Sequence, residues 1–82
     1  MKPRELIERS TSFGPDGVKA MGQALDEGWA EIAETFGSDP TIIEGTRMRL
    51  ANAILAAAGN GAKGVAALKR AAMETLRLNY LL

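Results

Sequence analysis

The sequence predicts an all-α protein: a small three-helix bundle, extended by a short additional N-terminal helix if the first residues are ordered. Three observations lead to this prediction. Breakers at Gly14-Pro15, Gly37-Ser38-Asp39-Pro40 and Gly59-Asn60-Gly61 divide the chain, and apolar residues recur at steps of three and four between them. A length of 82 residues then limits the chain to one helical domain over residues 1–82.

The first 12 residues form either a short helix or a frayed end. Pro3 suits the first position of a helix, and Glu5 and Arg9 have the spacing of a favourable ion pair along one helical face. A helix from Pro3 to about Arg9 is too short to be stable alone. We therefore expect Leu6 and Ile7 to dock on the rest of the protein or to fray with the chain end.

The second helix is expected over residues 15–36. Pro15 fits its first position, and Gly37 and Pro40 end it. Its apolar residues follow helical spacing and predict one buried face, made of Val18, Met21, Leu25, Trp29, Ile32 and Phe36.

The third helix is expected over residues 40–58, with Asp39 as its N-cap and Pro40 at its first position. Apolar and small residues lie on most of its sides, which indicates a central position in the bundle. Arg47 falls on the same face as Leu50 and Ile54, so its guanidinium needs a partner.

The fourth helix is expected over residues 63–80, and its apolar face contains Val65, Leu68, Ala72, Leu76 and Tyr80. Four large apolar residues gather near its C-terminal end: Leu78, Tyr80, Leu81 and Leu82. Exposed apolar clusters of this kind mark interaction surfaces. This end of the chain is therefore a candidate interface.

The composition argues against catalysis. The chain contains no His and no Cys, so the commonest general base, the commonest metal ligand and every thiolate are missing. We expect no enzyme activity, no cofactor and no metal site.

No apolar run approaches the about 20 residues of a membrane span, and the first residues lack the apolar segment of a signal peptide. We therefore expect a cytoplasmic protein without a membrane partner.

Charge is divided between the two halves of the chain although the net charge is zero. Residues 1–44 contain four basic and nine acidic residues, whereas residues 45–82 contain six basic residues and one acidic residue. This division indicates attraction between helices of one chain or between subunits. The alternative is that each helix simply has a charged face in water, where exposed pairs contribute little.

Three residues inside the helices are candidate contact residues. Trp29 is expected in the core or at an interface, and Leu50 lies on the same apolar face as Arg47. Arg47 is expected to form an ion pair with Glu44 or with an acidic residue of the second helix, or to extend to water. It could instead bind an anion. Gly22, Gly28 and Gly45 each weaken the predicted helices. Gly22, at the edge of the apolar face, either opens a groove for a crossing helix or a ligand or lies at a weakly packed position.

These features favour a small non-enzymatic interaction or regulatory protein that self-associates through apolar helix faces, with a dimer favoured. A first alternative is a nucleic-acid-binding module that uses Lys63, Lys69, Arg70 and Arg77 of the fourth helix. We do not favour a nucleic-acid partner, because Lys69 and Arg70 point about 100° apart and no basic arm accompanies them. A second alternative is a binder of small anionic ligands anchored by Arg47.

Residues 24–32 (ALDEGWAEI) and 46–55 (TRMRLANAIL) resemble small bacterial all-helical proteins of unknown function. Those proteins have an Ala-Phe-Asp-x-x-Trp-x-x-Ile segment followed by an Ala-Arg-x-x-Leu-Ala segment. Leu25 stands here where they have Phe, and Gly45-Thr46 precedes Arg47. The resemblance covers about residues 13–80. It implies a compact helical protein without an assigned activity, and it points to Trp29, Arg47 and Leu50.

Overall fold

The part of the chain that the structure describes folds into four α-helices and one short 3₁₀ helix. The computed structural model describes residues 2–33 and 39–81, with the side chains of these residues except 11 and 78–81. The elements are α1 (Pro3–Glu8), the 3₁₀ helix η1 (Thr11–Phe13), α2 (Gly14–Ile32), α3 (Pro40–Gly59) and α4 (Val65–Leu81). No strand occurs in these residues, so the expected all-α bundle with a short N-terminal helix is confirmed.

The starts of two helices follow from their sequence. Pro3 is the first residue of α1, and Pro40 is the first residue of α3. Asp39 caps α3 as expected, because its Oδ1 accepts a hydrogen bond of 2.9 Å from the backbone N–H of Thr41. This bond satisfies one of the backbone donors that a helix start leaves without an intrahelical partner.

Other boundaries differ from the prediction because of glycine. Helix α2 starts one residue before Pro15, at Gly14, whose φ of 76° turns the chain out of η1. Helix α4 starts at Val65 rather than at residue 63, because Gly61 and Gly64 have φ of 99° and 85° and interrupt the helical backbone. The predicted end of the second helix at Phe36, with Gly37 after it, lies outside the described residues.

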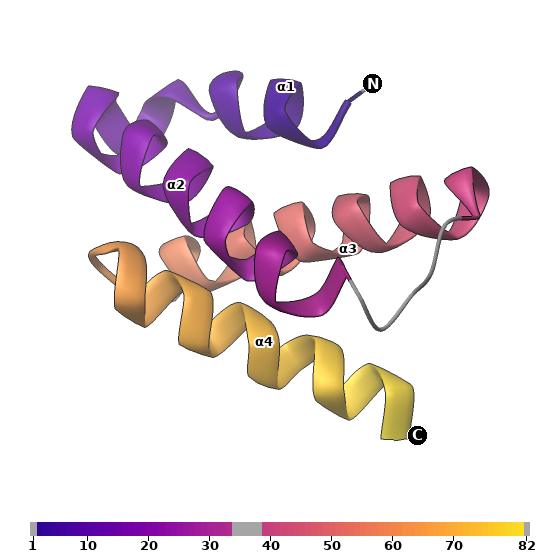
Figure 1. Ribbon diagram of the computed structural model, residues 1–82. Coiled ribbons are helices and arrows are strands. Elements are labelled where there is room, and N and C mark those ends of the chain that lie inside the picture. The colour runs from indigo at the N-terminus through magenta and orange to yellow at the C-terminus, as the bar shows by residue number, and fades with distance from the viewer. Residues whose placement is uncertain (1, 34–38, 82) are drawn as a thin grey trace.

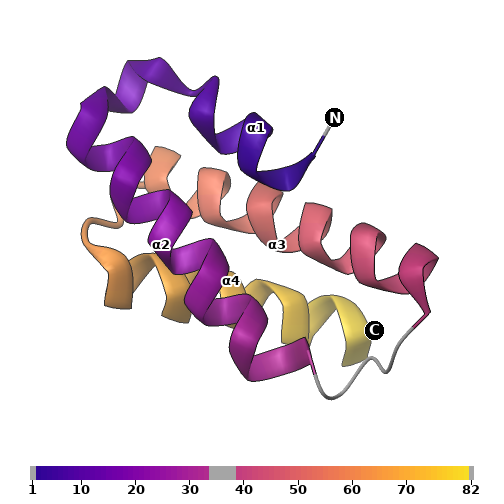
Figure 2. The same ribbon diagram turned by 45° about the horizontal axis from the view of Figure 1, so that its top comes forward.

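Helices α2, α3 and α4 all pack against one another. Helix α1 packs on α2 and α3, on the side of these two helices that faces away from α4, as both views show (Figures 1 and 2). The Cα radius of gyration is 11.9 Å. This value is close to the about 11.7 Å expected for a compact domain of this length.

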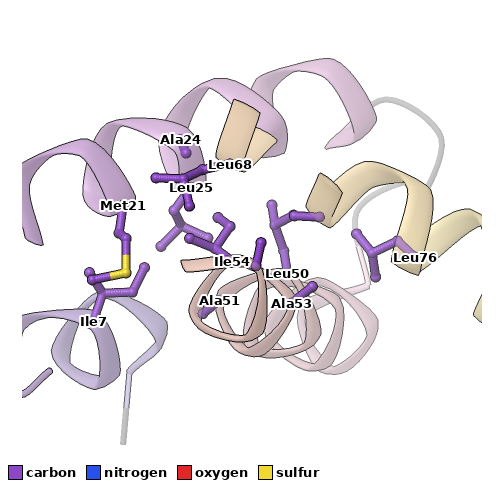
Figure 3. Packing of buried hydrophobic residues seen from close by; sticks show 12 residues of the cluster. Ile7, Met21, Ala24, Leu25, Leu50, Ala51, Ala53, Ile54, Leu68 and Leu76 are labelled. Carbon is purple, nitrogen blue, oxygen red and sulfur yellow. The ribbon is translucent and has the colours of Figure 1, made fainter. Parts of the chain in front are cut away.

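The core is narrow and rich in alanine. Its largest fully buried side chains are Ile7, Met21, Leu25, Leu50 and Ile54, and they come from α1, α2 and α3. Figure 3 shows Leu25, Leu50 and Ile54 converging where the helices cross. The remaining core residues are Leu68 and Leu76 from α4 and five alanines: Ala24, Ala51, Ala53, Ala57 and Ala72. Small residues at the contacts let the helices approach closely, as expected for a central third helix.

Helix α1 is attached by two buried residues, Pro3 and Ile7, and by an exposed ion pair. The Nη1 atom of Arg4 donates to Oδ2 of Asp26 in α2 at 2.7 Å, and this hydrogen bond and charge raise the pKa of Arg4 above its ordinary value. The predicted Glu5–Arg9 pair is wrong. Arg9 is the C-cap residue of α1, and the ion pair described within this helix instead joins Arg4 Nε to Glu8 Oε1 at 3.7 Å.

Candidate functional site

Trp29 and Arg47 meet where α2 lies beside α3. The guanidinium carbon of Arg47 is 5.7 Å from the centroid of the Trp29 ring, and both residues are half-buried. The partner of this cation within the described residues is therefore an aromatic ring rather than the expected carboxylate. Such a contact stabilises by about 0.5–1 kcal/mol at an accessible position. The Nε atom of Arg47 is buried, and the described residues supply no hydrogen-bond partner for it.

The other candidate contact residues either are buried in the core or have side chains outside the described residues. Leu50 is 0% exposed and belongs to the core, so it does not contribute to the surface of this chain. The side chains of Leu78, Tyr80 and Leu81, and the whole of Leu82, lie outside the described residues. A contact surface at that end of the chain therefore stays a prediction.

The acidic and basic halves of the chain meet at Lys69. Its Nζ lies 3.5 Å from Oε1 of Glu31 and 3.8 Å from Oε1 of Glu27, and it joins α4 to two consecutive turns of α2. The pairing occupies the two carboxylates that share one face of α2. It also withdraws Lys69 from the cations of α4 on which the nucleic-acid alternative depends. Across residues 2–33 and 39–81, no group of three or more His, Cys, Asp or Glu could hold a metal ion.

A cavity of about 440 Å³ lies between the start of α2 and the turn from α3 to α4. We call it the Phe13 pocket, and define it by the residues that line it: Phe13, Asp16, Gly17, Ala20, Met21, Ala58, Gly61, Ala62, Lys63, Gly64 and Leu68. Its floor is formed by Met21 and Leu68 of the core. Most of its other lining residues have small side chains or none, because they are alanines and glycines. The cavity is thus apolar, open at one side, and within the range of about 300–1,000 Å³ of ligand pockets.

The rim of the Phe13 pocket carries an aromatic ring and two charges. Phe13 is 37% exposed, which is unusual for so large an apolar side chain. Gly17 allows this position, since a Cβ atom at residue 17 would lie 2.9 Å from the Cβ atom of Phe13. Asp16 and Lys63 are exposed residues of the pocket lining, one on α2 and the other before α4. The described residues form no ion pair with either of them.

The residues that line this pocket carry only partial signals in the sequence. Phe13 stands directly before a helix start, and Gly61, Lys63 and Gly64 stand in a turn, so neither segment shows the periodicity that marks a buried face. The cavity exists because these two segments meet across the bundle. Apolar spacing along one helix cannot predict that meeting.

No helix in the described residues is long and apolar enough to cross a membrane. Comparison with protein-family models, with curated proteins and with solved structures found no match for the chain.

Proposed function

We propose that this chain is a small non-enzymatic interaction protein, which binds an apolar side chain of a partner protein in the Phe13 pocket. The observation that supports this proposal is an open apolar cavity of about 440 Å³ with an exposed aromatic ring at its rim. The absence of His and Cys from the sequence supports the non-enzymatic part. Aromatic anchors that enter apolar pockets contribute much of the binding energy in protein interfaces.

The pocket is large enough for this role. An apolar cavity of roughly 150 Å³ in a protein core binds benzene, so a benzyl group fits in a cavity of about 440 Å³. Burying a Phe side chain is favourable by about 1.5–3 kcal/mol. One anchor alone therefore binds weakly, and a stable complex requires further contacts around the rim.

The proposal is tested with N-acetyl-phenylalanine amide, a neutral probe that carries the benzyl group of a partner residue. The probe is titrated into the tens of millimolar, the range that so weak an anchor requires, while backbone amide shifts are followed by two-dimensional ¹H–¹⁵N NMR. We expect saturable shifts at Ala20, Met21, Ala62 and Gly64. Shifts spread over the whole surface, or none at the pocket, would contradict the proposal.

A matched pair of variants locates the probe. Ala62→Leu places three additional carbon atoms in the cavity, so it is expected to abolish the saturable shifts. Ala56→Leu makes the same change at an exposed position of α3 outside the pocket, and should leave them unchanged. Equal binding of the probe by both variants would place the probe elsewhere. Far-UV circular dichroism checks that both variants are folded.

A further inference from the structure

We propose that the occupant of the Phe13 pocket is Phe13 of a second copy of this chain, exchanged across a two-fold axis. The inference rests on the proposed function and names its partner. In a two-fold dimer the same patch of both subunits forms the interface, so every protruding group must find its complement on that same patch. The face around the Phe13 pocket meets this condition, because an exposed aromatic ring and an open apolar cavity adjoin on it.

The charges of this face are also self-complementary. Asp16 and Lys63 carry opposite charges, line the pocket from two different segments and are not paired within the described chain. A two-fold axis through the pocket face brings Asp16 of each copy toward Lys63 of the other. Each dimer thereby gains the same ion pair twice, at the rim of the apolar contact. Complementary charges at a rim mainly set the orientation of the partners.

Among the residues whose side chains are described, the other exposed large apolar one, Ile42, fits a second copy less well. Ile42 is 48% exposed, beside a shallow hollow of about 260 Å³ lined by Thr41, Gly45, Thr46 and Arg49. Arg49 is the charged residue of that lining as far as the chain is described. This hollow is smaller than the Phe13 pocket, and three of its lining residues, Thr41, Thr46 and Arg49, are polar or charged. The face around Phe13 is therefore the better candidate.

The expected dimer is weak. A standard interface takes about 800 Å² from each partner, which is about a seventh of the 5336 Å² surface of this small chain. The apolar centre proposed here is one ring in one cavity, given twice by symmetry. We therefore expect a reversible equilibrium between monomer and dimer.

Sedimentation equilibrium from 10 μM to about 1 mM tests the inference. We expect a mass that rises from monomer toward dimer, and a dissociation constant at least about 10-fold higher for Phe13→Ser or for Ala62→Leu. Ile42→Ser is the matched control, since it also removes an exposed apolar side chain, and it should change the constant less than about 2-fold. A wild-type chain that stays monomeric at 1 mM, or a dimer unaffected by Phe13→Ser, overturns the inference.

A charge exchange tests the two-fold geometry. Asp16→Lys and Lys63→Asp should each weaken the dimer several-fold, and the double variant should recover to within about 3-fold of wild type. Lys19→Asp changes the net charge as Lys63→Asp does but lies outside the pocket, so it should have little effect. A double variant as weak as the single ones would refute the proposed pairing. Circular dichroism controls folding in every case.

The two proposals fail in different ways. If wild type stays monomeric while N-acetyl-phenylalanine amide shifts the pocket residues, the pocket binds another partner and only the second-copy inference is wrong. If the probe does not bind and the chain is monomeric, both are wrong.

Discussion

Arg47 explains how a cation is placed on a largely apolar face of α3. The sequence correctly grouped Arg47 with Leu50 and Ile54, which share its face, and it indicated that the guanidinium needs a partner. It suggested a carboxylate, whereas the described partner is the ring of Trp29 at 5.7 Å. The ring could not be identified from spacing, because Trp29 is on another helix and reaches Arg47 only through the packing of α2 beside α3.

The helical glycines differ in what surrounds them. Gly22 is buried, and a Cβ atom there would lie 3.6 Å from Nη2 of Arg4, so the residue admits the side chain that crosses from α1. Gly28 faces the Cδ2 atom of Leu50, at 3.4 Å from the position of its Cβ atom. Gly45 is exposed and has nothing within 4 Å of that position. A Cβ atom at either of the first two positions would make ordinary van der Waals contacts, whereas nothing in the structure explains the glycine at the third.

Gly45→Ala should therefore stabilise the protein. Alanine lowers the conformational freedom of the unfolded chain and favours the helix by about 0.5–1 kcal/mol at an open helical position. The expected rise in Tm is about 2–8 °C for a domain of this size, measured by thermal unfolding with circular dichroism. Gly17→Ala is the comparison, and it should gain less because its Cβ atom would lie only 2.9 Å from the Cβ atom of Phe13. A larger gain for Gly17→Ala would contradict this argument.

Both the ammonium group and the aliphatic stem of Lys69 attach helix α4 to α2. The ammonium group pairs with Glu27 and Glu31, while the Cγ atom of Lys69 lies 3.7 Å from the position that a Cβ atom of Gly28 would take. The pairs are partly exposed, so we expect them to contribute less than the packing of the aliphatic stem. This division of roles can be measured.

Lys69→Met keeps an unbranched apolar stem and removes the charge, so the free energy of unfolding should fall by less than about 1 kcal/mol. Lys69→Ala removes the stem as well and should cost about 1 kcal/mol more, in line with the methylene groups lost. Urea unfolding measures both values, and 1 M salt should narrow the gap between wild type and Lys69→Met. Equal losses for the two variants would mean that the charge, rather than the stem, joins the helices.

At the level of elements, the sequence predicted most of the fold because proline at a helix start, an aspartate N-cap and apolar spacing are all local signals. The starts of α1 and α3 at Pro3 and Pro40 are confirmed, and so is the cap at Asp39. The start of α4 was wrong by two residues because Gly64 takes a positive φ, which its residue type permits but does not require. The 3₁₀ helix before α2 was not predicted either, since a three-residue helix has no periodicity.

At the level of the whole molecule, the division of charge is partly resolved within one chain. Glu27 and Glu31 of the acidic half pair with Lys69 of the basic half, whereas the pair between Arg4 and Asp26 lies within the acidic half. The sequence indicated this attraction but could not choose between neighbours in one chain and neighbours in two. The Phe13 pocket was missed for a related reason. It forms between segments that are far apart in the sequence, and contacts between such segments produce no pattern within either one.

The position of α1 has a consequence for cooperativity. Because α1 lies across α2 and α3 from α4, it can detach while the contacts among the other three helices remain (Figure 2). Only Ile7 and Pro3 of α1 are buried, so this local opening should require less free energy than global unfolding.

Native-state hydrogen exchange should then show weaker protection for the α1 amides than for those near Leu50. Ile7→Ala should lower protection in α1 most, whereas equal opening energies throughout would show that all four helices unfold as one unit. The bundle would on this view fold as a three-helix unit with α1 as a separate, less stable foldon.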